Sequence, residues 1–192
     1  MMKEVFGSMA LDDLKGYTFD DIRNLPENVR AELIDGQICY LAHPKTIHQA
    51  LVTDFVSTIN QYIKEHNGDC RVFATPFGVY LDKNTNTFVE PDICVICERS
   101  KIDFEGCNGA PDWIIEIVSP SSICMDYVKK LFKYRTAGVR EYWIVDPLKS
   151  RILVYCFEKD SIDEFSFRDT ISSEVLNGLE IDFSKMELLK NI

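Results

Sequence analysis

Three acidic residues, Glu32, Asp92 and Glu116, lie in segments whose neighbours have the apolar character of β-strands. Glu116 is the most unusual, because the rest of residues 113–118 is apolar and an acid in such surroundings is costly unless it is paired or binds a metal. Carboxylates that gather in one place repel each other and need a cation, and their hard oxygen atoms suit Mg²⁺ or Mn²⁺. The three acids are therefore candidate ligands of a divalent ion.

A lysine completes the candidate site. Lys130 lies in the next predicted helix after Glu116 and recurs with Asp126 and Tyr134 every four residues, so these three share one helix face. A bound divalent ion polarises a phosphoryl oxygen and lowers the pKa of a bound water, and a lysine can orient that water or stabilise the developing charge. Such a set would cleave a phosphodiester. Simpler interpretations stay open, since Asp126 and Lys130 could form an exposed helix pair and an Asp at a strand end commonly lies in a turn.

The central stretch, residues 111–146, must position Glu116 and Lys130. Residues 113–118 are typical of a strand that is buried on both faces. Residues 119–122 end this strand and offer a hydroxyl N-cap, and residues 125–137 are predicted to form a helix that ends at Gly138.

The remaining elements are predicted from periodicity and turn residues. Asp35-Gly36 between two alternating runs predicts a hairpin, and the apolar spacing of residues 46–66 predicts a long helix. Further predictions are a short helix after Thr18, strands at 70–81 and 88–97, a hairpin of 139–146 with 151–157, and strands at 164–170 and 174–176. The pattern predicts an α+β fold with one mixed sheet, a long helix in the N-terminal half, a mid-chain helix and extra C-terminal strands. We expect a single domain over residues 1–192.

Composition favours an ordinary globular protein. The 192 residues are 46% hydrophobic and 27% charged, which suits one domain with a sizeable core. The N-terminal residues carry acids and have no long apolar run, so we expect no signal peptide, no membrane association and a cytoplasmic location.

The charge is unevenly distributed. The net charge of −10 argues against a protein that coats nucleic acid through its overall field. Residues 126–151, however, contain seven basic and three acidic residues, a local charge of +4. This patch suits contact with DNA phosphates, although a solvated helix and hairpin explain it as well.

Seven cysteines without a secretion signal predict free thiols rather than disulfides. Cys94 and Cys97 have a spacing typical of zinc ligands, but on one strand they would point to opposite faces. Packing in the core is the favoured role.

Taken together, the segments resemble the PD-(D/E)XK nuclease superfamily, and within it the Uma-two family of restriction-endonuclease-like proteins. The resemblance extends from about residue 17 to 189 and rests on the helix opened near His48 and on the order of YTFDDIRNLPE, AELIDGQI, VEPDICVI, WIIEIVSPSS, DYVKKLFKYRTAGVREYWIVDP and GLEIDF.

The resemblance implies roles for individual residues. Asp92 resembles the metal-binding Asp of the superfamily, Glu116 its second acid, and Glu32 an early acid that is an extra or supporting ligand. The usual lysine, two residues after the second acid, is Val118 here. The resemblance therefore points to a lysine that has moved to the following helix, Lys130, with Lys129 as the less favoured choice.

Accessory roles and partners are implied by the same resemblance. His48, Tyr134 and Asp126 are possible accessory residues; His48 could equally be a surface or capping residue, and Tyr134 a core contact. The implied activity is Mg²⁺-dependent cleavage of DNA, with Mn²⁺ as a substitute and a homodimer as the assembly. The alternatives are a nuclease-fold module that binds nucleic acid or protein without catalysis and, less favoured, a zinc protein.

Overall fold

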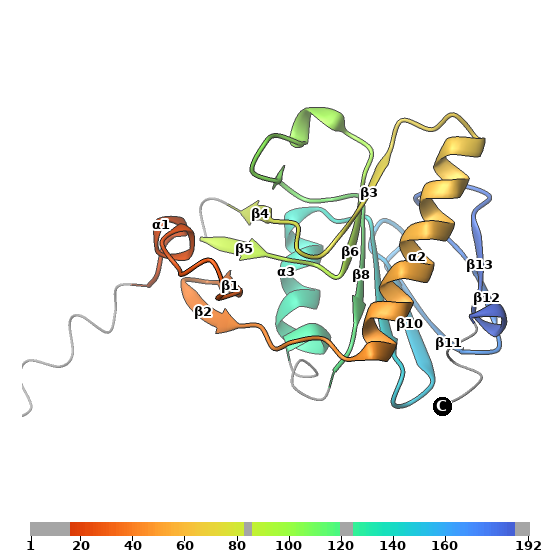
Figure 1. Ribbon diagram of the computed structural model, residues 1–192. Coiled ribbons are helices and arrows are strands. Elements are labelled where there is room, and N and C mark those ends of the chain that lie inside the picture. The colour runs from red at the N-terminus through yellow and green to blue at the C-terminus, as the bar shows by residue number, and fades with distance from the viewer. Residues whose placement is uncertain (1–15, 83–85, 120–124, 187–192) are drawn as a thin grey trace, which may run out of the picture.

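The computed structural model describes residues 16–82, 86–119 and 125–186, and its centre is a mixed six-stranded sheet (Figure 1). The strand order is β11-β10-β9-β8-β6-β3, with β8 parallel to β9 and antiparallel to β6. These strands span Ser161–Ser166 (β11), Arg151–Cys156 (β10), Glu141–Asp146 (β9), Trp113–Ile117 (β8), Ile93–Ile96 (β6) and Arg71–Ala74 (β3).

Two further sheets accompany the central one, so the prediction of a single mixed sheet is wrong in this respect. A five-stranded sheet has the order β2-β1-β5-β4-β7, and a two-stranded sheet pairs β12 with β13. Their strands span Gln37–Tyr40 (β2), Ala31–Ile34 (β1), Thr87–Val89 (β5), Val79–Asp82 (β4), Cys107–Asn108 (β7), Thr170–Ser172 (β12) and Glu180–Asp182 (β13). The α+β class itself is confirmed.

Two predicted long strands are each divided between the two larger sheets. Residues 70–81 form β3 and β4, and residues 88–97 form β5 and β6. A proline lies in each interruption, Pro76 after a cis Thr75–Pro76 bond and Pro91 before Asp92. A proline cannot donate a ladder hydrogen bond, so each chain segment leaves one sheet there and enters the other. Asp92 therefore lies where the two sheets meet.

The helices match their predicted positions closely. Helix α1 spans Phe19–Arg23 after Thr18, whose backbone N–H donates to the Asp21 carboxylate over 2.7 Å. Helix α2 spans Thr46–Glu65, and α3 spans Leu131–Ala137 and ends at Gly138, whose φ of 94° is left-handed. The predicted helix at 125–137 differs in its first half, because Met125–Lys130 is a π-helix. Short 3₁₀ turns span Arg99–Lys101 and Phe183–Lys185. None of the helices in the described part of the chain is both long and apolar enough to cross a membrane.

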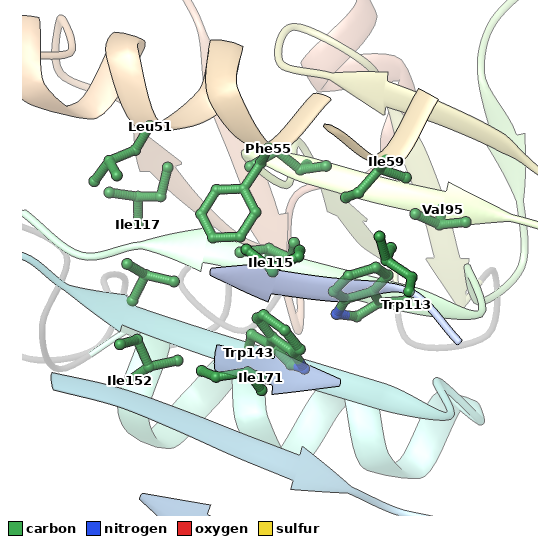
Figure 2. Packing of buried hydrophobic residues seen from close by; sticks show 14 of the residues in the cluster. Leu51, Phe55, Ile59, Val95, Trp113, Ile115, Ile117, Trp143, Ile152 and Ile171 are labelled. Atoms are coloured by element: carbon green, nitrogen blue, oxygen red, sulfur yellow. The ribbon is translucent and has the colours of Figure 1, made fainter. Parts of the chain in front are cut away.

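The central sheet separates two hydrophobic cores, and β8 is buried on both faces as predicted. One core packs α2 against β8 and β9, with Phe55 and Ile59 over Trp113, Ile115 and Trp143 (Figure 2). The other core contains Ile114, Val118 and the side chain of Tyr134 from α3. Because side chains alternate along a strand, Glu116 projects from the face of β8 that α3 covers.

The C-terminal region contains the predicted 139–157 hairpin but departs from prediction after it. Strands β9 and β10 pair antiparallel from Glu141↔Cys156 to Asp146↔Arg151. The next strands are β11, β12 and β13, whereas residues 174–176 are not a strand. The backbone N–H groups of Glu174 and Val175 donate hydrogen bonds to the side chain of Glu141 instead. The periodicity of the sequence cannot indicate such a contact.

The cysteines depart from prediction at one pair. Cys70 and Cys97 form a disulfide, because antiparallel pairing of Arg71 with Ile96 makes them neighbours across two strands. The expectation of free thiols is therefore wrong for these two. Bonded to Cys70, Cys97 is not a zinc ligand, and burial raises the pKa of the Cys94 thiol well above its usual value, which keeps it neutral in the core.

Candidate active site

A cavity of about 420 Å³ opens where the five-stranded sheet meets the central sheet. Four predicted site residues line it: Glu32 from β1, Asp92 before β6, Glu116 from β8 and Lys130, the last residue of the π-helix and the N-cap of α3. Their side chains are 2%, 16%, 4% and 6% exposed, respectively. Residues that are far apart in the chain thus share one largely enclosed polar site.

Asp92 and Glu116 are held together by the β6–β8 pairing. Because Ile93 pairs with Ile115, Asp92 and Glu116 are the next residues along the same ladder. Each carboxylate accepts a backbone hydrogen bond from the opposite strand. The Ile117 N–H donates to Asp92 Oδ2 over 2.8 Å, and the Asp92 N–H donates to Glu116 Oε2 over 3.3 Å. The backbone therefore fixes the position of both acids.

The Lys130 ammonium lies between two glutamates. Its Nζ atom is 2.8 Å from Glu32 Oε1 and 3.0 Å from Glu116 Oε1. Glu32 Oε1 also accepts a hydrogen bond from the Glu90 N–H over 3.0 Å. A buried cation needs such partners, because desolvation of an unpaired charge costs several kcal/mol. The amine therefore points into the site and not to solvent.

Two of the three accessory residues also reach the carboxylates. The Tyr134 hydroxyl donates to Glu116 Oε1 over 2.7 Å, and the tyrosine is fully buried. His48 Nε2, from the first turns of α2, is 3.0 Å from Asp92 Oδ2. The buried Nδ1 atom of His48 has no hydrogen-bond partner in the described part of the chain. The side chain of the third, Asp126, lies outside the described residues.

The helical face that carries Lys130 and Tyr134 is only partly the predicted one. These two residues follow each other at four-residue spacing where α3 begins, so both reach Glu116. Asp126 and Lys130 are joined by the π-helix, in which the four-residue repeat of an α-helix does not hold.

Sequence reasoning missed a second charged pair beside the site. Arg30 Nε and Nη2 donate to Glu90 Oε2 over 2.9 and 2.6 Å, and Nη2 also contacts the Thr75 hydroxyl. All three residues line the cavity. The spacing in the sequence could have indicated this pair. Arg30 lies two residues before Glu32, and Glu90 lies two residues before Asp92. In an extended chain, residues two apart lie on the same face.

The donor set fits a divalent ion held by few protein ligands. No group of three or more His, Cys, Asp or Glu side chains in the described part of the chain is arranged to enclose a metal. Mg²⁺ is commonly bound by one or two carboxylates together with water and phosphate oxygens. Asp92 and Glu116 offer that arrangement, and Asp92 Oδ1 accepts no hydrogen bond from any described residue. The oxygen chemistry therefore fits Mg²⁺ or Mn²⁺.

The basic segment is more nearly neutral than its composition indicates. Lys130 is buried in the site, and most of the other cations pair with acids: Lys133 with Asp35, Arg135 with Asp160, Arg140 with Asp112 and Glu158, Lys149 with Asp146, and Arg151 with Glu164. Lys129 has no acidic partner among the described residues. The segment alone therefore provides little unbalanced positive charge.

Comparison with known structures gives the class of fold. The chain superposes on "a putative nuclease belonging to DUF820" from Anabaena variabilis ATCC 29413 with a TM-score of 0.74. The match has 24% sequence identity and covers 90% of this chain and 98% of the other. The chain thus has a nuclease fold.

The family follows from the sequence match. Residues 18–184 match Uma2, described as "Putative restriction endonuclease". The chain belongs to this Uma2 family, as its resemblance indicated, and is a nuclease-like protein. No curated protein matches the chain.

Proposed function

We propose that the protein is a metal-dependent endonuclease that hydrolyses DNA phosphodiester bonds. The observation that carries this proposal is the Lys130 ammonium, which lies within 3.0 Å of both Glu32 and Glu116 beside Asp92. Burying an amine together with three acids costs desolvation free energy, so stability alone does not explain this cluster, and such clusters are typical of functional sites.

Asp92 and Glu116 are the residues that would hold Mg²⁺ or Mn²⁺. When bound, such an ion polarises the phosphoryl oxygen and makes a bound water more acidic. Glu32 holds Lys130 through Oε1, and this ion pair supports a positioning role for Glu32 more than direct ligation.

The other side chains position these groups. Lys130 places positive charge where the negative charge of the phosphorane develops, and its second partner, Glu116, is oriented by the Tyr134 hydroxyl. His48 orients Asp92 through Oδ2. The hydrogen bonds from Asp92 N–H and Ile117 N–H keep the two carboxylates in place before substrate arrives.

Nicking of supercoiled plasmid tests the proposal. We expect cleavage with Mg²⁺ or Mn²⁺ that stops in EDTA. Asp92→Asn and Lys130→Met should each lower the rate by about 10²- to 10⁴-fold, the usual range for a lost acid–base or electrostatic group. Lys129→Met is the matched control and should keep the activity, because its side chain is exposed and unpaired among the described residues. Equal activity of wild type and both site variants would contradict the proposal.

A binding module without catalysis is the alternative, first motivated by Val118 at the usual lysine position. Lys130 in contact with Glu116 supplies that amine from another element, and this favours the enzyme. Titration calorimetry with Mn²⁺ separates the two: heat of binding that disappears in Glu116→Gln supports the enzyme. Tight DNA binding with no metal uptake and no cleavage would favour the module.

A further inference from the structure

The wall of the cavity beside the acids is apolar. Leu41, Pro44 and Ile47 line it from the β2–α2 connection and α2, while Ile117 and Val118 line it from the end of β8. At its mouth, Tyr40 and Leu148 are 69% and 66% exposed, respectively, although both are large hydrophobic side chains. Large apolar side chains that line a cavity and remain exposed to solvent indicate a surface that binds something.

A phosphate alone does not account for this wall. A phosphodiester and its metal need oxygen ligands and positive charge, and these are already at one end of the cavity. The apolar part suits the flat face of a nucleobase, which packs on aromatic and aliphatic side chains whatever its sequence. The volume of about 420 Å³ lies within the range of about 300–1,000 Å³ typical of small-ligand pockets.

The depth of the acids in the cavity also favours the entry of a single nucleotide. The side chains of Glu32 and Glu116 are 2% and 4% exposed, so the scissile phosphate must enter the cavity to reach their carboxylates. Inside an intact duplex each nucleotide is stacked and paired, and moving one out costs a few kcal/mol. A single strand does not pay this unpairing cost. Lys45, which lines the cavity and has no acidic partner among the described residues, can contact a neighbouring phosphate.

We propose that the cavity receives one unstacked nucleotide of single-stranded DNA, with its base against Tyr40 and the apolar wall and its phosphate at Asp92 and Glu116. This inference rests on the proposed nuclease function and adds the substrate class. Tyr40 is the residue that selects an unpaired strand. Both faces of a base inside a duplex are covered by its stacked neighbours, so the Tyr40 ring can stack only on a base that has left the duplex stack.

Binding and cleavage are measured separately to test it. Anisotropy of a labelled oligonucleotide in EDTA compares the single strand with the same strand in a blunt duplex. We expect tighter binding of the single strand and a Kd about 5- to 140-fold weaker for Tyr40→Ala, the loss of one stacked base. Tyr40→Phe should retain wild-type binding. Phe104→Ala is the matched control, because Phe104 is fully exposed and does not line the cavity.

Cleavage with Mn²⁺ supplies the second measurement. We expect the single strand to be cut at least about 10-fold faster than the duplex, since unstacking costs the duplex a few kcal/mol. If DNA is cut but the duplex reacts as fast and Tyr40→Ala binds as tightly as wild type, the nucleotide pocket is wrong and the nuclease stands. If nothing is cut but single-strand binding depends on Tyr40, the pocket stands and the proposed hydrolysis fails.

Discussion

At the scale of single residues, Glu116 is the point on which the site converges. Its Oε1 atom accepts hydrogen bonds from both Lys130 and Tyr134, and its Oε2 atom faces the Asp92 N–H. With Glu32, the buried cluster contains two carboxylates for one ammonium, so each donor offsets repulsion between like charges. Removing any of these hydrogen-bond donors should therefore lower the stability of the fold as well as the proposed activity.

Tyr134→Phe removes one of these donors without changing the volume of the core. We expect the free energy of unfolding to fall by about 1.5–3 kcal/mol, because the lost hydrogen bond is to a charged, buried group. Urea unfolding followed by circular dichroism measures it. Tyr155→Phe removes a hydroxyl that makes no hydrogen bond among the described residues, and should change stability by less than about 0.5 kcal/mol. Equal effects of the two substitutions would contradict the role of the Tyr134 hydroxyl.

At the scale of elements, one buried side chain fastens the C-terminal region to the central sheet. Glu141, on β9, accepts hydrogen bonds at Oε2 from the Ser173 hydroxyl and from the N–H groups of Glu174 and Val175, over 2.9–3.0 Å. Its Oε1 accepts from Trp143 Nε1 over 2.7 Å. The connection between β12 and β13 is thus held by an acid with 0% exposure.

The same acid should make stability depend on pH. Burial raises the pKa of Glu141 above its usual value of 4.5, although its hydrogen bonds act the other way. An acid whose pKa is higher in the folded than in the unfolded state contributes stability that is fully present below the unfolded pKa and is lost as pH rises through the folded pKa. Glu141→Gln does not titrate there, so its free energy of unfolding should rise relative to wild type from pH 4.5 upward.

Urea unfolding at a series of pH values measures this difference. Glu164→Gln is the control, because Glu164 on β11 is 61% exposed and should change the pH dependence little. If the free energies of unfolding of wild type and Glu141→Gln differ by the same amount at every pH, the titration of Glu141 does not cause the pH dependence.

At the scale of the whole molecule, the central sheet ends at a strand that has a strand partner on only one side in the described part of the chain. Strand β11 is at the edge of the sheet, and its Ile162 is 64% exposed. Edge strands present unpaired backbone groups that readily pair with another chain, and closed twofold dimers are the commonest assemblies. We propose that the protein forms a homodimer by pairing the β11 edges of two copies.

Size-exclusion chromatography with light scattering tests the assembly. We expect wild type to elute as a dimer and Ile162→Lys to shift to the monomer, because a charged side chain on an edge opposes pairing. Val128→Lys is the control, since Val128 is 61% exposed but lies on the π-helix and not on the edge. A wild-type monomer, or a dimer that Ile162→Lys leaves intact, would overturn the proposal.

The sequence by itself determined the elements whose signals are local. The apolar period of α2, the Asp35-Gly36 turn and the double-sided burial of β8 are each encoded within a few neighbouring residues, and all three are present. The order of the motifs also identified the family correctly. Residue types and that pattern together named Asp92, Glu116 and Lys130 as candidate site residues, and their side chains line one cavity.

Only the tertiary structure decided which segments lie against each other. Three features depend on which distant segments become neighbours. They are the division of two predicted strands between sheets at Pro76 and Pro91, the Cys70–Cys97 disulfide, and the hydrogen bonds of Glu141 to residues 173–175. The same is true of the Arg30–Glu90 pair and of Tyr40 at the cavity mouth. A local pattern carries no record of such contacts, because their free energy arises only when chain segments far apart in the sequence pack together.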